Sequence, residues 1–233
     1  MAAAQRALSL DPDIAEAYCA RARHHYENGR FAEADEGLER ALQLDPDSCE
    51  VHREAARIYY FLRRFPEAIH HYERAVAIDE TDYHSWGMLA SAYGAVGDKD
   101  GTMRAAGMAV MHSKRVVEND PTNGAALGMA GYGLAMMGER ERMKEWVDRA
   151  LLLNPDNVIM QYNFACVTAL NLGDAEGALD LLEPLLDDFT PSALKAAMAD
   201  PDLDCLRDNP RFMRLMERAK KALEAHQSAD ASG

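Results

Sequence analysis

Small and apolar residues recur along this chain in a pattern that combines helical spacing with a longer repeat. Ala22, Ala56 and Ala90 follow one another at a constant interval, and Tyr59 and Tyr93 show the same interval. Within a repeat the apolar positions recur every three or four residues, which is typical of an amphipathic helix. The longer period, about 34 residues, is the length of a helix-turn-helix unit. The pattern therefore predicts an all-α chain of stacked antiparallel helix pairs.

Aspartate-proline or asparagine-proline pairs separate the repeats. One repeat length lies between Pro12 and Pro46 and again between Pro121 and Pro155, and Asp79-Glu80 marks the same point with the proline lost. Proline cannot continue a helix but fits the first turn of the next one. Each unit is therefore expected to run as helix A, a tight turn, helix B and an Asp-Pro turn.

This spacing predicts the order of segments along the chain. Residues 1–12 are expected to form a lone B-type helix, either as a cap or because the chain is cut from a longer protein. Residues 13–189 hold five repeats, residues 190–227 form C-terminal capping helices, and residues 228–233 are a disordered tail. The interval from Glu80 to Pro121 exceeds one repeat by seven positions. These extra positions add about 10 Å of helix, so we expect one lengthened helix over residues 99–118.

The repeat pattern ends after Gly173-Asp174. Residues 175–188 should form a B helix that Pro184 bends or ends early. Thr190, Asp200 and Asn209 each precede a proline, which is a helix-start signal. The last helix should run from Pro210 towards His226. Its apolar stripe is expected to cover the end of the final repeat and consists of Phe212, Leu215, Met216, Ala219 and Leu223.

Composition and charge narrow the class of protein. The 233 residues are 48% apolar and 27% charged, as in an ordinary folded protein, and the net charge is −14. This acidity argues against a nucleic-acid partner, which requires clustered lysine and arginine. The four cysteines lack C-x-x-C spacing, and neither a signal peptide nor an apolar run long enough to cross a membrane occurs. We expect a cytoplasmic protein with free thiols and no membrane partner.

The pattern resembles the tetratricopeptide repeat (TPR) family over roughly residues 1–190. Its small residues recur where helix A must approach helix B closely, and aromatic residues fill the adjoining gaps. The resemblance implies a right-handed superhelical solenoid whose concave face is lined by the A helices. Three residues depart from the family pattern: Arg21 where leucine is usual, Arg63 where glycine often ends helix A, and Glu80 where proline is usual.

A second resemblance covers roughly residues 158–215. The runs Gln161-Tyr-Asn-Phe-Ala-Cys166 and Asp200-Pro-Asp-Leu-Asp-Cys-Leu-Arg-Asp-Asn-Pro-Arg-Phe212 look like the closing segment of TPR arrays in bacterial multidomain signalling proteins. In those families the array follows a class III nucleotidyl cyclase, protein kinase or winged-helix DNA-binding domain. The resemblance implies a bacterial source and a docking or sensory role beside an effector domain.

Motifs for catalysis or cofactor binding are absent from the sequence. No G-x-S-x-G, H-E-x-x-H or kinase signature occurs. Gly124, Gly128, Gly131 and Gly133 lack the preceding strand and spacing of a phosphate loop, so we interpret them as points of close helix packing. The His-His-Tyr runs at His24 and His70 lack ligands at i+4. We therefore expect no enzyme activity, no cofactor and no metal.

The repeat register predicts which side chains line a peptide-binding groove on the A helices. Three arginines and two tyrosines form a basic-aromatic patch, and small residues edged by two further tyrosines form a hollow. The predicted groove residues are Arg23, Tyr26, Arg53, Arg57, Tyr60, His84, Tyr132, Tyr162 and Asn163. One hypothesis is that Arg53 and Arg57 bind an acidic side chain of a partner peptide. The equal alternative is internal pairing with Glu16, Glu50 or Glu54.

These features predict a non-catalytic scaffold that binds a protein or peptide partner and belongs to a bacterial signalling protein. The alternative is a small-ligand-sensing domain of a cyclase or kinase, with the ligand held in the hollow near Tyr132. Homodimerisation is also possible, because solenoid ends and the lengthened third B helix offer surfaces for self-association.

Overall fold

The computed structural model describes residues 2–230, with side chains described except at residues 2, 187, 188, 192 and 225–230. All regular secondary structure in this part of the chain is helical. Its elements are α1 (Ala2–Leu10), α2 (Ala15–Glu27), α3 (Phe31–Leu44), α4 (Cys49–Phe61), α5 (Phe65–Ile78), α6 (Tyr83–Ala95), α7 (Lys99–Asn119), α8 (Gly124–Met136), α9 (Arg140–Leu153), α10 (Val158–Leu170), α11 (Ala175–Leu182), the 3₁₀ helix η1 (Glu183–Asp188), α12 (Pro191–Ala199), the 3₁₀ helix η2 (Pro201–Leu206) and α13 (Pro210–Asp230). The all-α prediction is confirmed.

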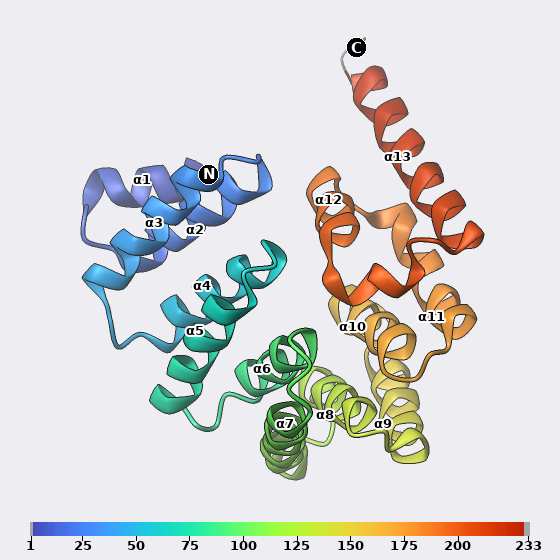
Figure 1. Ribbon diagram of the computed structural model, residues 1–233. Helices are drawn as coiled ribbons and strands as arrows, with labels where there is room; N and C mark the ends of the chain where they lie inside the picture. The colour runs from blue at the N-terminus through green and yellow to red at the C-terminus, as the bar shows by residue number, and fades with distance from the viewer. Residues whose placement is uncertain (1, 231–233) are drawn as a thin grey trace. The chain divides into compact units, whose positions relative to one another are not determined.

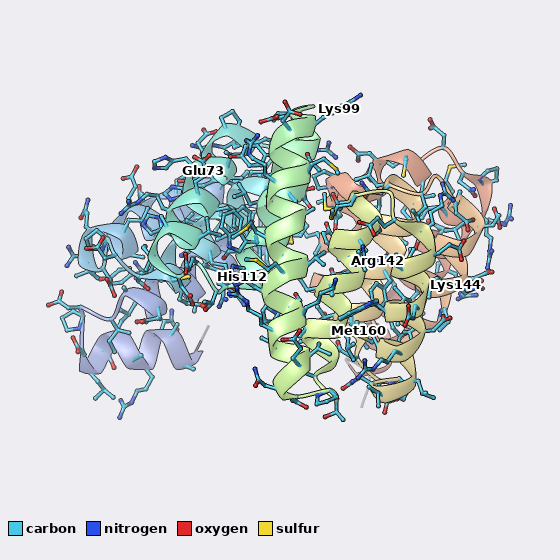
Figure 2. All side chains as sticks on the ribbon, turned by 90° about the horizontal axis from the view of Figure 1, so that it is seen from below. Glu73, Lys99, His112, Arg142, Lys144 and Met160 are labelled. Carbon is cyan, nitrogen blue, oxygen red and sulfur yellow. The ribbon has the colours of Figure 1, made fainter. Side chains whose placement is uncertain are left out.

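The chain divides into two compact units with the boundary inside α7. Unit 1 comprises residues 1–105 and unit 2 residues 106–233. In unit 1, α2 packs against α3 and α4 against α5; in unit 2, α8 packs against α9 and α10 against α11 (Figure 1). α7 is a single 21-residue helix, as its sequence predicts, and Figure 2 shows it unbroken. Each helix pair therefore has the expected A–B arrangement.

Short polar signals set where the A helices begin. The Ser48 hydroxyl and the Asn123 and Asn157 side-chain carbonyls each accept a hydrogen bond from a backbone N–H three residues later. The Asp82 carboxylate does the same for the N–H of His84. Such caps satisfy donors that have no partner within the helix. In each of these turns the proline position is therefore followed, two residues later, by a side chain that caps the next A helix.

The turns between the A and B helices need a left-handed backbone conformation. Four of them have glycine with φ between 66° and 78°, the conformation that glycine adopts without steric cost: Gly29, Gly97, Gly138 and Gly173. The second repeat places Arg63 there instead, with φ 59°. The departure noted in the sequence therefore keeps the turn but makes an arginine adopt a conformation that costs roughly 1–2 kcal/mol for residues other than glycine.

The glycines of α8 are points of close helix packing, as predicted. A Cβ atom at Gly128 would lie 2.8 Å from Cγ of Met160, and one at Gly131 would lie 3.1 Å from Cγ2 of Val147. α8 is therefore pressed against both α9 and α10, and every residue of it except Ala125 is buried. This dense packing leaves no room for a bound phosphate at these glycines.

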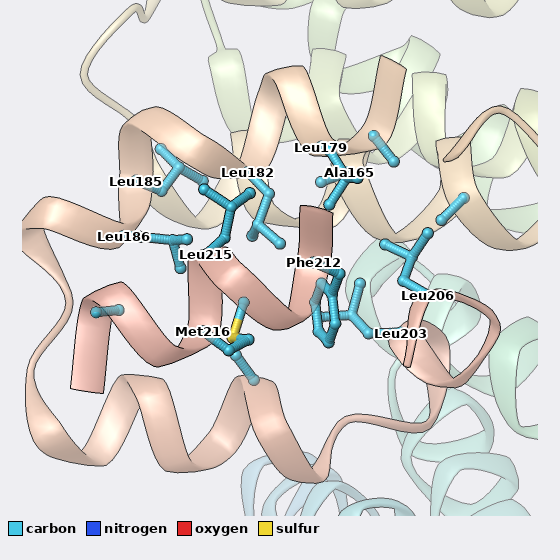
Figure 3. Close-up of a cluster of buried hydrophobic side chains, with 14 of the residues drawn as sticks. Ala165, Leu179, Leu182, Leu185, Leu186, Leu203, Leu206, Phe212, Leu215 and Met216 are labelled. Atoms are coloured by element: carbon cyan, nitrogen blue, oxygen red, sulfur yellow. The ribbon is translucent and has the colours of Figure 1, made fainter. Parts of the chain in front are cut away.

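The C-terminal end of unit 2 forms its own hydrophobic cluster. α11 ends at Leu182, two residues before Pro184, and the chain continues as η1, as the proline predicts. Phe212, Leu215 and Met216 of α13 are buried in this cluster (Figure 3). Ala219 is buried there too, and Leu223 packs against it partly buried, so the predicted stripe is present. α13 continues to Asp230, past the predicted end near His226 and into the segment expected to be disordered. Residues 231–233 lie outside the described residues.

Candidate interaction surface

The three predicted groove arginines lie on α2 and α4 of unit 1, and two of them share one carboxylate. Nε and Nη2 of Arg23 each donate to the Glu54 carboxylate at 2.6 Å, and Nη2 of Arg57 donates to Glu54 Oε1 at 2.9 Å. The Glu54 side chain is 5% exposed, whereas the two arginine side chains are 45% and 40% exposed. A buried anion thus holds two cations whose outer edges face solvent.

The pKa of Glu54 reflects this arrangement. Burial alone would raise it, because the charged form loses its water. The hydrogen bond from Arg23 and the nearby charge of Arg57 outweigh burial and lower the pKa below its usual value. Glu54 therefore stays ionised at neutral pH and fixes both guanidinium groups in place.

Arg53 is held in a similar way by two other carboxylates. It forms an ion pair with Glu50, one turn earlier on α4, and its Nη1 donates to Asp82 Oδ2 at 3.3 Å. Asp82 is well anchored, since it caps α6 and also accepts a 2.6 Å hydrogen bond from the Ser85 hydroxyl. The structure thus shows the internal pairing that was the alternative hypothesis: Arg53 pairs with Glu50 and Arg57 with Glu54. We call the half-exposed surface of Arg23, Arg53 and Arg57 the arginine face.

The other predicted groove residues of unit 1 contribute less surface. Tyr60 is 1% exposed and packs its ring on Phe61 and Phe65, with ring centroids 6.0 and 5.5 Å away, so a partner has no access to it. Tyr26 is half-buried beside Phe61, with ring centroids 6.4 Å apart. His84 is half-buried next to Tyr83, and burial lowers the pKa of its imidazole, which is therefore neutral at pH 7.

A histidine pair that the sequence analysis did not anticipate lies between α4 and α5. Nδ1 of His52 is 3.0 Å from Nδ1 of His71, and Nε2 of His52 is 3.0 Å from the Pro46 carbonyl oxygen. Because that carbonyl can only accept, His52 carries its proton on Nε2 and accepts through Nδ1 from His71. Burial, with the neighbouring His52, lowers the pKa of His71 to about 4. Both rings are therefore neutral at pH 7.

In unit 2 the two predicted tyrosines are covered by the chain itself. The Tyr162 hydroxyl donates to Asp200 Oδ2 at 2.7 Å, and the Tyr132 hydroxyl donates to Asp202 Oδ2 at 3.3 Å. Tyr132 is 4% exposed, while Tyr162 and Asn163 are half-buried. The expected hollow beside Tyr132 is therefore occupied by residues of η2 and its N-cap. We call the α8–α10 surface that carries these two tyrosines the tyrosine face.

Asp200 and Asp202 are candidate functional residues that the sequence analysis did not identify. They are 4% and 6% exposed, and burial together with the charge of Asp202 raises the pKa of Asp200 to about 7. The signal was the run from Asp200 to Leu206, whose alternating acidic and apolar residues were interpreted as a helix start and as part of a family resemblance, not as a cover for the tyrosines. Among the described residues no group of three or more potential ligands is placed to hold a metal ion, and no helix has the length and apolarity needed to span a bilayer.

Comparison with known proteins identifies the fold. Residues 13–81 match the tetratricopeptide repeat family. No curated protein sequence matches the chain. Among solved structures, it is similar to PilW, titled a widely conserved type IV pilus biogenesis factor (TM-score 0.53, 17% identity, covering 91% of this chain and 93% of that chain). It is also similar to TTC0263, a thermophilic TPR protein of Thermus thermophilus (0.52, 22%, 90% and 98%), and to pilF of Pseudomonas aeruginosa (0.51, 16%, 94% and 98%).

At these identities the solved structures show a shared fold and nothing more about function. The family match places the repeat directly in the helix pairs that carry the arginine face. The pairs α8–α9 and α10–α11 follow the same A–B pattern with glycine in the turn. We conclude that the chain has the fold of tetratricopeptide repeat proteins and that residues 13–81 match this family in sequence.

Proposed function

We propose that this TPR protein is a non-catalytic protein–protein interaction scaffold whose arginine face binds a peptide carrying an acidic side chain. One observation carries the proposal: Arg23 and Arg57 share the single buried carboxylate of Glu54 and keep exposed edges. A guanidinium has five N–H donors, more than the bonds to Glu54 occupy. The group formed by these three residues has a net charge of +1 in a chain whose net charge is −14.

The arrangement favours an incoming carboxylate because the cations are already positioned. A charge-assisted hydrogen bond is worth about 1.5–3 kcal/mol when the pair is desolvated. Arg53 adds a further donor, because its partner Glu50 is 51% exposed and can give way to a ligand carboxylate. Arg53 and Arg57 are one helical turn apart on α4, so one extended or helical segment reaches both.

The tyrosine face does not compete for this role in its present state, because residues 200–206 cover it. The same cover removes the space in which a small ligand beside Tyr132 would bind. The small-ligand alternative therefore has no observation in its favour, and the arginine face is the surface that we assign to partner binding.

The test uses peptides selected by phage display against the full chain. For a selected acidic peptide, Arg53→Ala combined with Arg57→Ala should raise the Kd at least tenfold, since about 1.4 kcal/mol is lost per factor of ten. Arg74→Ala is the matched control: Arg74 lies in the same repeat, is 46% exposed and pairs with Asp47. An unchanged Kd in the double variant, or an equal loss in the control, would refute the proposal.

A proposal about the parent protein rests on the resemblance of residues 158–215 to the closing segment of TPR arrays in bacterial signalling proteins. We propose that the chain is the docking part of a cytoplasmic bacterial signalling protein. The open reading frame of the parent gene tests this directly. A cyclase, kinase or winged-helix domain encoded upstream of Met1 supports the proposal, and an upstream region without an effector domain contradicts it. Sedimentation at several concentrations tests whether the chain forms a homodimer.

A further inference from the structure

Residues 200–206 lie on the tyrosine face in the manner of a bound peptide. Asp200 and Asp202 each accept a hydrogen bond from a tyrosine hydroxyl, and the backbone N–H of Asp202 donates to Asp200 Oδ1 at 2.9 Å. η2 packs along α10. The two aspartates thus accept hydrogen bonds from tyrosines of two successive A helices, α8 and α10. Asp200 also closes the backbone turn of the segment through its bond with the Asp202 N–H.

Two leucines anchor the same segment. Leu203 and Leu206 are 0% and 1% exposed, and they belong to the hydrophobic cluster that includes Ala165 and Cys166 of α10. Figure 3 shows both leucines beside Phe212 in this cluster. Burying a leucine side chain contributes roughly 1.5–3 kcal/mol. The segment therefore combines two apolar anchors three residues apart with two carboxyl groups, as a recognition peptide does.

The tyrosine face meets the Asp200 carboxyl group with a phenol hydroxyl. This hydroxyl belongs to Tyr162. The thiol of Cys166 and the carboxyl group of Asp202 also lie close enough to Asp200 to interact with it electrostatically. The guanidinium of Arg207 donates instead to the carbonyl oxygens of Met198 and Asp200 and to the Asp204 carboxylate. Burial beside Asp202 raises the pKa of Asp200 to about 7. The hydrogen bond from the Tyr162 hydroxyl opposes this rise, because it favours the ionised carboxylate. The face therefore receives an acidic side chain through a neutral phenol donor.

We propose that the tyrosine face is a second peptide-binding surface, which takes a short acidic segment with leucines three residues apart, and that residues 200–206 are its built-in occupant. The proposal does not depend on the arginine face, because it concerns a different unit and a different chemistry. A tethered occupant competes at an effective concentration in the millimolar range. An external segment of the same chemistry displaces it only when it is present at that concentration or when the tethered segment is weakened.

Hydrogen exchange of the wild-type chain tests the competition without any substitution. The probe is a synthetic peptide, Asp-Pro-Asp-Leu-Asp-Ser-Leu, and the control is a scrambled peptide of the same composition. At about 5 mM probe, the amides of residues 203–207 should exchange at least tenfold faster, while those of α2–α5 stay unchanged. Equal exchange with the probe and the scrambled peptide would overturn the proposal.

Binding to a weakened variant gives an independent readout. Leu203→Ala with Leu206→Ala removes both anchors of the tethered segment and leaves Tyr132 and Tyr162 in place. This variant should bind a fluorescein-labelled probe saturably and at least tenfold more tightly than wild type. Adding Tyr132→Phe and Tyr162→Phe should abolish the gain. A double-leucine variant with native circular dichroism and no probe binding shows that residues 200–206 are only part of the core. If that variant does not fold, the wild-type exchange experiment decides.

Discussion

Unit 1 and unit 2 place different side chains at equivalent repeat positions, and the two surfaces differ accordingly. Arg23 and Arg57 occupy the position that Tyr132 holds in the fourth repeat, and Arg53 occupies the position of Tyr162 in the fifth, once the extra length of α7 is counted. The arginines pair with buried carboxylates and stay half-exposed, whereas the tyrosines are covered by the chain's own η2.

The difference follows from the cost of burying each side chain. A guanidinium covered by a protein segment needs full compensation for its lost water. A phenol needs only one hydrogen-bond partner, and burying its apolar ring contributes favourable free energy. One repeat architecture therefore gives an open, charged face in one unit and a closed, neutral face in the other.

The largest expected effect is on the closed face. Leu203→Ala removes a side chain with 0% exposure, so the free energy of unfolding should fall by about 3 kcal/mol, from lost burial plus the remaining cavity. Urea denaturation measures this, with Leu152→Ala as the control, because that leucine is 81% exposed. A loss below about 1 kcal/mol would show that η2 is not packed as described.

Removing the buried anion of the open face is expected to have the next largest effect. Glu54→Gln leaves two arginines without their shared charge and should lower the free energy of unfolding by about 2 kcal/mol. Glu50→Gln is the control: Glu50 is 51% exposed, and exposed ion pairs contribute at most about 1 kcal/mol. Equal effects in urea titrations of both variants would contradict the role of Glu54 as the anchor of the arginine face.

Stability should depend on pH with opposite sign in the two units. The folded-state pKa of Asp200 is about 7, above the ordinary 3.8, so its contribution is present below 3.8 and is lost as pH rises to about 7. The pKa of His71 is about 4, below the ordinary 6.5, so its contribution is lost as pH falls from 6.5 to about 4. Each effect should be on the order of 1 kcal/mol, the equivalent of about one pKa unit, and the partial exposure of His71 reduces its share through solvent screening.

Hydrogen exchange followed by mass spectrometry at pH 5 and pH 8 separates the units for this test. After correction for intrinsic rates, residues 200–206 should open more readily at pH 8, and the contact between α4 and α5 should open more readily at pH 5. Asp200→Asn, which keeps the shape of the neutral acid, should remove the pH dependence of η2 alone. A pH response of the same sign in both units would contradict the burial of one of these groups.

The smallest effect concerns the turn in which the two units differ. Arg63→Gly should raise the free energy of unfolding by about 0.5–1 kcal/mol, because glycine adopts the positive φ of 59° without the steric cost. Thermal denaturation measures the gain. Gly138→Ala in unit 2 provides the matched reverse change, with an expected loss of about 1 kcal/mol.

The sequence was sufficient for the helix pairs and for the lengthened α7, because small-residue spacing, prolines and caps act locally. It also placed Arg53 and Arg57 on one surface, since the repeat period fixes the register of the A helices. It did not predict the cover on Tyr132 and Tyr162. Those contacts join residues 70 and 38 positions apart through a 3₁₀ segment that has no repeat periodicity.

Tyr60 shows that the position of a residue in the repeat does not by itself predict whether its side chain is exposed. Its position in the repeat suggested the groove, but Phe61 and Phe65 surround its ring. Local aromatic packing therefore decided its burial. Internal pairing of Arg53 and Arg57 was one of two equal hypotheses, and the side-chain geometry shows the pairs Arg53–Glu50 and Arg57–Glu54. The pairing of Arg23 with Glu54 across 31 residues was not predicted.

Amide hydrogen exchange of wild-type η2 shows whether unit 2 closes its tyrosine face with its own residues while unit 1 keeps an open arginine face. The amides of Leu203 and Arg207 donate to the Asp200 and Asp204 carbonyl oxygens, so we expect them to exchange at least about 100-fold more slowly than in an unstructured peptide. Exchange of these amides at the unstructured rate would show that the tyrosine face is open in solution and that residues 200–206 do not cover it.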